Sequence, residues 1–194
     1  MSNYRILIAG GGTGGHLFPA LAIGEEIHRR EPEAKIHYVG STFGMEARVF
    51  PVKDVWHTLL PIRGFQRGIS FQSIGRNFLL PVRIILSWLK MNSLIKDFAP
   101  QVVVGTGGYA AALPLYLASK RDKPLPIVLQ EQNSIPGITT RWFAEKAKTI
   151  CVAFKEANDA INSETILTGN PVRKDITEGH REDGIKEYNF DEKS

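Results

Sequence analysis

Short apolar runs alternate along the chain with longer segments in which apolar residues recur at helical spacing. The apolar runs predict β-strands, several of which end in glycine or polar residues as buried parallel strands do; they cover residues 4–9, 36–39, 56–62, 102–104, 127–130, 149–154 and 165–167. The periodic segments predict helices; they cover residues 17–30, 44–50, 78–98, 110–120 and 137–146. Pro32 should end the first helix, and Pro81 is expected to kink the helix that contains it.

This alternation of strands and helices predicts an α/β fold: a Rossmann-like parallel sheet with helices on both faces. The crossover connections between its strands should be right-handed. We expect residues 1–173 to form this domain. The polar tail at residues 174–194, with an expected helix at 182–188, is interpreted either as a free terminus or as a linker to a second domain.

A glycine-rich loop joins the first predicted strand to the first helix. Gly10, Gly12 and Gly15 satisfy the G-x-G-x-x-G pattern, in which bare backbone lets N–H groups approach an anion and the helix N-terminus favours negative charge. An NAD site is disfavoured, because the second strand ends at residues 39–42 without an acid to hold the ribose. A P-loop is excluded because His16, not Lys, follows Gly15. A sugar-nucleotide or diphosphate site and a purely structural turn remain open.

Two further predicted strand ends carry polar or glycine-rich residues. Residues 105–109 read Gly-Thr-Gly-Gly-Tyr, and residues 131–133 read Glu-Gln-Asn. The carboxyl ends of parallel strands share one edge of the sheet, where open α/β sheets bind ligands, so the three segments should converge on one cleft. His16 stands in that cleft, at the first turn of the first helix. It is either a general base, since imidazole titrates near neutral pH, or a residue that only bonds locally.

The composition is that of an ordinary globular α/β protein, with 194 residues, 43% hydrophobic and 23% charged, and a net charge of +4. Cys151 is the only cysteine, which excludes an intrachain disulfide, and we expect it to act as a small buried hydrophobe. Because no uninterrupted run of 18 apolar residues exists, no transmembrane helix is expected.

Positive charge is concentrated in the middle of the chain. Residues 55–96 contain no acid and six basic residues, which suggests an anionic partner. Within the helix predicted at 78–98, one apolar stripe is interpreted as a core face: Ile84, Trp88, Met91, Ile95 and Phe98. A second apolar stripe is flanked by basic residues: Val82, Ile85, Leu86 and Leu89, with Arg83 and Lys90. It either packs under residues 63–77 or docks on an anionic membrane surface. A nucleic-acid surface is disfavoured, because no nucleic-acid-binding motif accompanies the basic residues.

Four sequence blocks resemble the MurG family of bacterial glycosyltransferases, in that family's order and spacing; they are residues 10–20, 104–109, 131–137 and 169–173. The resemblance implies a GT-B glycosyltransferase with two Rossmann-like domains, of which residues 1–173 would be the N-terminal, acceptor-side and membrane-side domain. It implies transfer of N-acetylglucosamine from UDP-N-acetylglucosamine to the 4-hydroxyl of the muramoyl sugar of lipid I. The product would be lipid II, formed with inversion and without metal or other cofactor, at the cytoplasmic face of the cell membrane. The family's donor domain does not follow, so the fragment alone should not turn over substrate.

The resemblance also implies roles for individual residues. His16 matches the family's candidate base, and Glu131 and Tyr109 match cleft residues. Five residues match positions that contact the donor: Thr13, Gly14, Gly15, Asn133 and Arg173. We expect the diphosphate of lipid I on the glycine loops: Gly12, Gly105, Thr106, Gly107 and Gly108. Without the motif, Arg173 would be interpreted as an ordinary surface ion pair.

One position departs from the family pattern. Gln130 stands where the family often has His, which weakens any mechanism that needs two histidines. The absence of an Asp-x-Asp pair agrees with metal independence. The alternative hypothesis is a non-catalytic domain that binds membrane or acts as a scaffold.

Overall fold

The computed structural model describes residues 4–64, 79–173 and 185, and it is built around one parallel sheet. The strands are β1 (Arg5–Gly10), β2 (Lys35–Ser41), β3 (His57–Leu60), β4 (Val102–Gly107), β5 (Ile127–Glu131), β6 (Thr149–Val152) and β7 (Ile166–Leu167). Their order across the sheet is β3-β2-β1-β4-β5-β6-β7, and every neighbouring pair is parallel. This order places the topological switch point between β1 and β4, where doubly wound sheets bind ligands.

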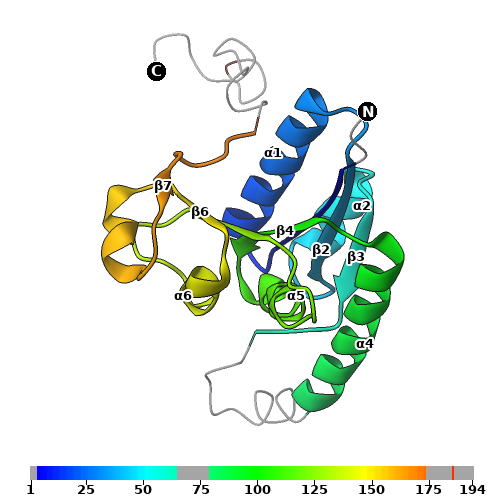
Figure 1. Ribbon diagram of the computed structural model, residues 1–194. Coiled ribbons are helices and arrows are strands. Elements are labelled where there is room, and N and C mark those ends of the chain that lie inside the picture. The colour runs from blue at the N-terminus through cyan, green and yellow to red at the C-terminus, as the bar shows by residue number, and fades with distance from the viewer. Residues whose placement is uncertain (1–3, 65–78, 174–184, 186–194) are drawn as a thin grey trace.

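Helices cover both faces of the sheet (Figure 1). The described helices are α1 (Gly14–Arg30), α2 (Glu46–Val52), α4 (Leu80–Phe98), α5 (Tyr109–Ser119) and α6 (Ile138–Phe143), with 3-10 turns at Ala144–Lys146 and Lys155–Ala160. One hydrophobic cluster joins the sheet to α1 and α2, and a second joins it to α4, α5 and α6. The predicted α/β class with helices on both faces is therefore confirmed.

Strand β1 shows how the sequence builds these two layers. Successive side chains of a strand point to opposite faces, so Ile6 and Ile8 join the cluster under α1 whereas Leu7 and Ala9 join the cluster under α5. All four are buried. An apolar residue at every position, in place of the alternation of a half-exposed strand, is what a strand covered on both sides requires.

Four expectations drawn from the sequence are corrected. Strand β4 continues through Gly107, so residues 105–107 belong to the sheet and not to the loop. Pro81 is the second residue of α4, in the first turn, where a missing N–H costs nothing, so it does not kink the helix. The helix expected at 137–146 is α6 followed by a 3-10 turn, and the last strands are shorter than expected. Residues 65–78, which include most of the loop expected at 63–77, and residues 174–184 and 186–194 of the expected tail lie outside the described residues, and so does the expected domain boundary.

Candidate functional site at the switch point

The two glycine loops meet at the ends of β1 and β4. Gly10 pairs with Gly107 in the sheet register, at the edge where both strands end. The loops are in such close contact that a Cβ atom on Gly108 would lie 2.1 Å from the carbonyl oxygen of Gly11. A Cβ on Gly12 would lie 2.6 Å from Cε1 of Tyr109. The expectation that the loops share one rim is confirmed, and glycine is required because no side chain fits between them.

The third segment reaches the same rim through the side chain of Gln132. Its Nε2 donates a hydrogen bond of 2.8 Å to the carbonyl oxygen of Thr106. Strand β5 lies directly beside β4. The residues after β1, β4 and β5 therefore converge as expected.

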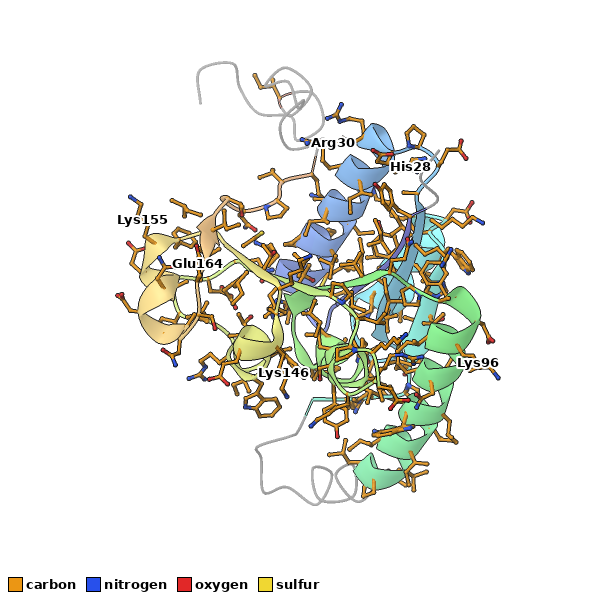
Figure 2. All side chains as sticks on the ribbon, in the orientation of Figure 1. His28, Arg30, Lys96, Lys146, Lys155 and Glu164 are labelled. Atoms are coloured by element: carbon orange, nitrogen blue, oxygen red, sulfur yellow. The ribbon has the colours of Figure 1, made fainter. Side chains whose placement is uncertain are left out.

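The first turn of α1 faces this rim. Thr13 precedes the helix with an extended backbone, and its carbonyl oxygen accepts from the N–H groups of His16 and Leu17. Thr13 and Gly15 are exposed. The N–H groups of a first helical turn have no intrahelical acceptor and can bind an anion. The basic residues of α1, His28 and Arg30 among them, lie at the opposite end of the helix (Figure 2) and contribute nothing to this rim.

A buried carboxylate that sequence reasoning missed already occupies one loop amide. Glu46 is fully buried, and both its oxygens accept from the N–H of Gly12, at 3.1 and 3.0 Å. Oε1 also accepts from the N–H of Ser41 at 2.7 Å. The side chain lies where Cβ atoms on Gly11, Gly40 or Gly44 would collide with it. A single acid in a short helix is normally exposed, so no sequence signal distinguished this one.

His16 projects from α1 against the backbone of the second glycine loop. Its Nδ1 lies 3.0 Å from the carbonyl oxygen of Thr106 and 3.0 Å from Oε1 of Gln132. A carbonyl oxygen can only accept, so Nδ1 carries the proton in the neutral ring. Nε2 then holds a lone pair, and it makes no hydrogen bond to any residue that the structure describes. This is the arrangement that a general base requires.

Glu131 organises the loop after β5. Its carboxylate is buried and accepts from the N–H groups of Asn133 and Gly137 at 3.1 and 3.0 Å. It also accepts from Nδ2 of Asn133 at 2.8 Å and from the hydroxyl of Thr140. With four donors the carboxylate is committed to holding the loop, and it orients Asn133, which is itself exposed.

The residues of the second glycine loop divide into buried and accessible members. Gly105, Thr106 and Gly107 are buried in β4, and the Thr106 hydroxyl donates to the carbonyl oxygen of His16 at 2.8 Å. Gly108 is partly exposed. Tyr109 begins α5, and its hydroxyl lies 3.4 Å from Oγ of Ser41. Of this loop, Gly108 and Tyr109 are therefore the residues that a ligand can reach.

Arg173 lies beside the first turn of α1. Its guanidinium carbon is 4.3 Å from the centroid of the Phe18 ring, a cation–π geometry. Phe18 in turn lies against Gly14. The last sequence block therefore approaches the first glycine loop, although the two are far apart in the sequence.

Helix α4, which the sequence pattern made a candidate for membrane docking, is only half covered by the rest of the protein. Its buried row is Ser87, Met91, Ile95 and Phe98. Ile84 and Trp88, expected in the core, are 40% and 42% exposed, because the first half of α4 extends past the strands (Figure 1). The second stripe is more than half exposed at every position: Val82, Ile85, Leu86 and Leu89. No helix in the described part of the chain is long and apolar enough to cross a membrane.

The two basic residues expected to flank this stripe turn toward the protein. The guanidinium of Arg83 stacks 4.8 Å from the centroid of the Phe43 ring. Nζ of Lys90 donates to the carbonyl oxygen of Leu59 at 2.9 Å. Other basic residues, which follow α5, line a cavity beside α4.

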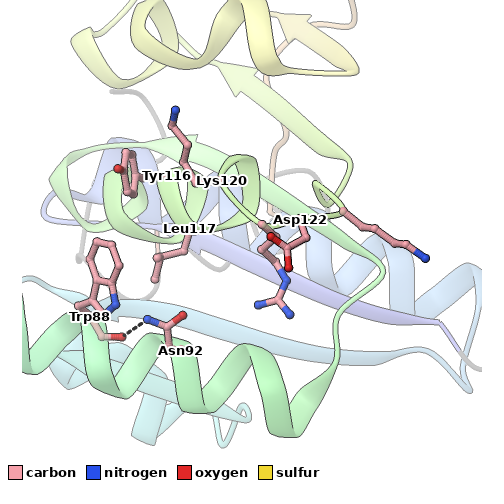
Figure 3. Close-up of a pocket in the computed structure, with 8 residues that line it drawn as sticks. Trp88, Asn92, Tyr116, Leu117, Lys120 and Asp122 are labelled. Atoms are coloured by element: carbon pink, nitrogen blue, oxygen red, sulfur yellow. Dashed lines mark hydrogen bonds between the residues drawn. The ribbon is translucent and has the colours of Figure 1, made fainter.

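That cavity, of about 600 Å³, lies between α4 and the end of α5 (Figure 3). The rings of Trp88 and Tyr116, with centroids 6.0 Å apart, line one side. Its charged lining consists of one acid, Asp122, and three basic residues: Lys120, Arg121 and Lys123. Trp88 belongs both to this cavity and to the exposed apolar part of α4. Within the described residues, no cluster of three or more His, Cys, Asp or Glu could hold a metal ion.

Comparison with known proteins places the chain in a family. The chain is 40% identical over 178 residues to the UDP-N-acetylglucosamine–N-acetylmuramyl-(pentapeptide) pyrophosphoryl-undecaprenol N-acetylglucosamine transferase of Christiangramia forsetii, covering 89% of this chain and 46% of the relative. It is 41% identical over 176 residues to the protein of the same name from Amoebophilus asiaticus, covering 90% and 47%. The crystal structure of MurG from Acinetobacter baumannii has the same fold, with a TM-score of 0.67 at 24% identity over 88% of this chain and 46% of that chain.

The chain spans about half the length of the curated relatives it matches. The relatives bear out the resemblance inferred from the four sequence blocks. A family model, the glycosyltransferase family 28 N-terminal domain, matches residues 6–152. The chain therefore belongs to glycosyltransferase family 28, whose N-terminal domain it carries.

Proposed function

We propose that this chain is the acceptor-side half of an enzyme that transfers N-acetylglucosamine from UDP-N-acetylglucosamine to the 4-hydroxyl of the muramoyl sugar of lipid I. The product would be lipid II. The names of relatives at about 40% identity support this reaction. The observation that carries it is the position of the His16 ring where the two glycine loops meet. Its Nδ1 is hydrogen-bonded to Thr106 and Gln132, which leaves the lone pair on Nε2.

In the proposed reaction Nε2 of His16 takes the proton of the acceptor hydroxyl as its oxygen attacks the anomeric carbon. The bond to UDP breaks as the new glycosidic bond forms, with inversion and without a metal. N–H groups of the first α1 turn, near Thr13, Gly14 and Gly15, would contact the donor. Arg173, beside the same helix, and Asn133, after β5, would also contact it.

The diphosphate of lipid I would lie on the same rim. The N–H of Gly12 is already bonded to Glu46, and the residues of β4 before Gly108 are buried. We therefore narrow the proposed diphosphate contacts to the partly exposed backbone at Gly108 and the dipoles of α1 and α5. Glu131 and Tyr109 would position neighbouring groups. The uracil and ribose would bind to the part of these enzymes that the chain does not cover, so the chain alone should be inactive.

Lipid I is anchored in a bilayer, and we propose that the exposed face of α4 docks on its cytoplasmic surface. The four residues of the second stripe would enter the interface. Lys120, Arg121 and Lys123 would meet anionic headgroups, each with roughly 1 kcal/mol of attraction. Vesicle cosedimentation should show binding that increases with anionic lipid and weakens in an Ile85→Asp, Leu89→Asp variant. Equal binding by that variant would exclude this face.

The reaction is tested by joining the chain to the C-terminal half of the Christiangramia forsetii relative and measuring lipid II formation from vesicle-bound lipid I. We expect product only when both halves are present. His16→Ala should lower turnover by about 10²- to 10⁴-fold, the usual contribution of a general base. His28→Ala, at the exposed far end of the same helix, is the matched control and should leave turnover unchanged. Undiminished turnover in His16→Ala would remove His16 from the mechanism.

The exposed apolar face of α4 also favours the second candidate, a non-catalytic membrane-binding or scaffold domain. Vesicle binding by the joined protein without any lipid II, in the presence of both substrates, would favour this reading over the transferase.

A further inference from the structure

We infer that Gln132 is a positioning residue that holds His16 in the tautomer with its proton on Nδ1, which leaves Nε2 as the basic nitrogen. The catalytic meaning of this inference rests on the proposed function. The tautomer itself does not, because it follows from hydrogen bonds within the chain.

The orientation of the Gln132 amide is determined by its surroundings. One end of the amide faces two carbonyl oxygens, those of Thr106 at 2.8 Å and Gln130 at 3.1 Å. It also contacts Oε1 of Gln130. The two backbone carbonyl oxygens can only accept and therefore require a donor, so this end is the NH₂ group. The other end, which faces His16 at 3.0 Å, is therefore the oxygen.

This orientation determines where the His16 proton lies. Nδ1 faces two atoms that can only accept, the carbonyl oxygen of Thr106 and Oε1 of Gln132. A ring protonated only on Nε2 would place the Nδ1 lone pair against both of them. Unlike a carboxylate in this position, the amide adds no negative charge beside the imidazole.

The ring is also held in place sterically. Cβ atoms on Gly107 and Gly108 would lie 2.8 and 3.0 Å from atoms of the His16 ring. The ring therefore lies directly on bare backbone, and the partners of Nδ1 come from two strand ends at once. A 180° flip of the ring would put Cδ2 in the place of Nδ1 and break both hydrogen bonds.

Gln130, the residue that departs from the family pattern, takes part in this arrangement. Its Oε1 accepts from Gln132, while its own buried Nε2 has no hydrogen-bond partner among the described residues. Turning the Gln130 amide over would set two NH₂ groups against each other. An unpartnered buried donor is destabilising, and here it accompanies an oxygen that accepts from Gln132.

The test uses the chain as it is, by NMR of the histidine ring nitrogens in ¹⁵N-labelled protein above the pH at which the rings protonate. A protonated and an unprotonated ring nitrogen have well-separated chemical shifts. His57 provides an internal reference for the Nδ1–H form, because its Nδ1 donates to the carbonyl oxygen of Val55 at 2.8 Å. The exposed His28 reports the ordinary solution mixture.

We expect His16 to match His57 and not His28. In Gln132→Met, which keeps the side-chain length and removes the amide, the His16 signals should move toward a mixture of tautomers while those of His57 stay unchanged. The smaller Gln132→Ala gives the same reading if the Met variant does not fold. A wild-type His16 protonated on Nε2 would overturn the inference. An unchanged tautomer in the variant would also overturn it, because Thr106 alone would then suffice.

The enzyme assay separates this inference from the proposed function. In the joined enzyme, Gln132→Met should lower kcat by about two- to tenfold, the worth of one hydrogen bond, with little change in KM for either substrate. A confirmed tautomer with no lipid II from wild type would refute the transferase and leave the positioning of His16 intact. Lipid II formation by an enzyme whose His16 is protonated on Nε2 would support the transferase and refute the positioning of His16.

Discussion

The buried carboxylate of Glu46 should be a major determinant of the stability of the first glycine loop. It accepts from two N–H groups, the buried one of Ser41 and the partly buried one of Gly12. Glu46→Ala would leave both without a partner, at about 1–3 kcal/mol each. Lost packing adds to this, so the expected loss is about 4 kcal/mol, a large share of the roughly 5–15 kcal/mol that stabilises a domain.

Glu46→Gln separates charge from shape. The Gln oxygen can keep the position of Oε1, which bonds both Ser41 and Gly12, while the new NH₂ faces the Gly12 N–H from the Oε2 position, 3.0 Å away. Hydrogen bonds to a charged group exceed neutral ones by about 1 kcal/mol each. Removing the charge also relieves its desolvation. The loss of hydrogen-bond strength exceeds the relief of desolvation by a small margin, and we expect Glu46→Gln to lower the free energy of unfolding by about 1–2 kcal/mol.

The assay is urea unfolding followed by the fluorescence of the three tryptophans, with equal m-values required for the comparison. Glu33→Ala, at an exposed acid in the turn before β2, is the control and should change stability by no more than about 0.5 kcal/mol. The expected order of destabilisation is Ala, then Gln, then the control. A Glu46→Ala variant within about 1 kcal/mol of the control would refute the view that this carboxylate supports the loop.

Three further outcomes follow from the same structure. Gly108→Ala should destabilise by about 2–4 kcal/mol, because Gly108 has φ +75° and its new Cβ would meet the carbonyl oxygen of Gly11. Gly15→Ala, on α1, should unfold at equal or higher urea, because its Cβ would make only an ordinary contact of 3.8 Å with Oγ1 of Thr13. Burial, with a smaller contribution from His57, lowers the pKa of His37 to about 4. The contribution of this group to the free energy of unfolding is therefore complete above the unfolded pKa of about 6.5 and is lost as the pH falls toward about 4, with a slope approaching about 1.4 kcal/mol per pH unit. The His37→Gln variant should lack this slope. Burial raises the pKa of the Cys151 thiol, so iodoacetamide at pH 8 should alkylate the native chain more slowly than the urea-unfolded chain, and equal rates would contradict this.

The fold and the location of the site could be predicted from the sequence because both depend on local patterns. Strand and helix periods are visible over a few residues, and a strand followed by glycines marks the carboxyl edge of a parallel sheet wherever that strand lies in it. The convergence of residues 10–15, 105–109 and 131–133 followed from this rule, without knowledge of the strand order.

The helix at 80–98 shows where local pattern stops being sufficient. The helical spacing of apolar residues assigns a stripe to the core but does not say how far the sheet extends beneath it. The prediction that Ile84 and Trp88 lie in the interior was therefore wrong. In the same way, the reach of a long basic side chain depends on what lies beside it. Arg83 stacks on Phe43 and Lys90 donates to the Leu59 carbonyl oxygen, and both of these partners are distant in the sequence.

The polar groups of the site were decided by the tertiary structure alone. Glu46 is buried because the start of α2 packs against β2, and Gln132 meets His16 only because β4 and β5 are neighbours. Hydrogen bonds are short-ranged and directional, so each depends on atoms brought together from segments up to 116 residues apart. The sequence by itself determined which backbone could approach an anion; the folded chain determined which side chains hold that backbone and where the proton of His16 lies.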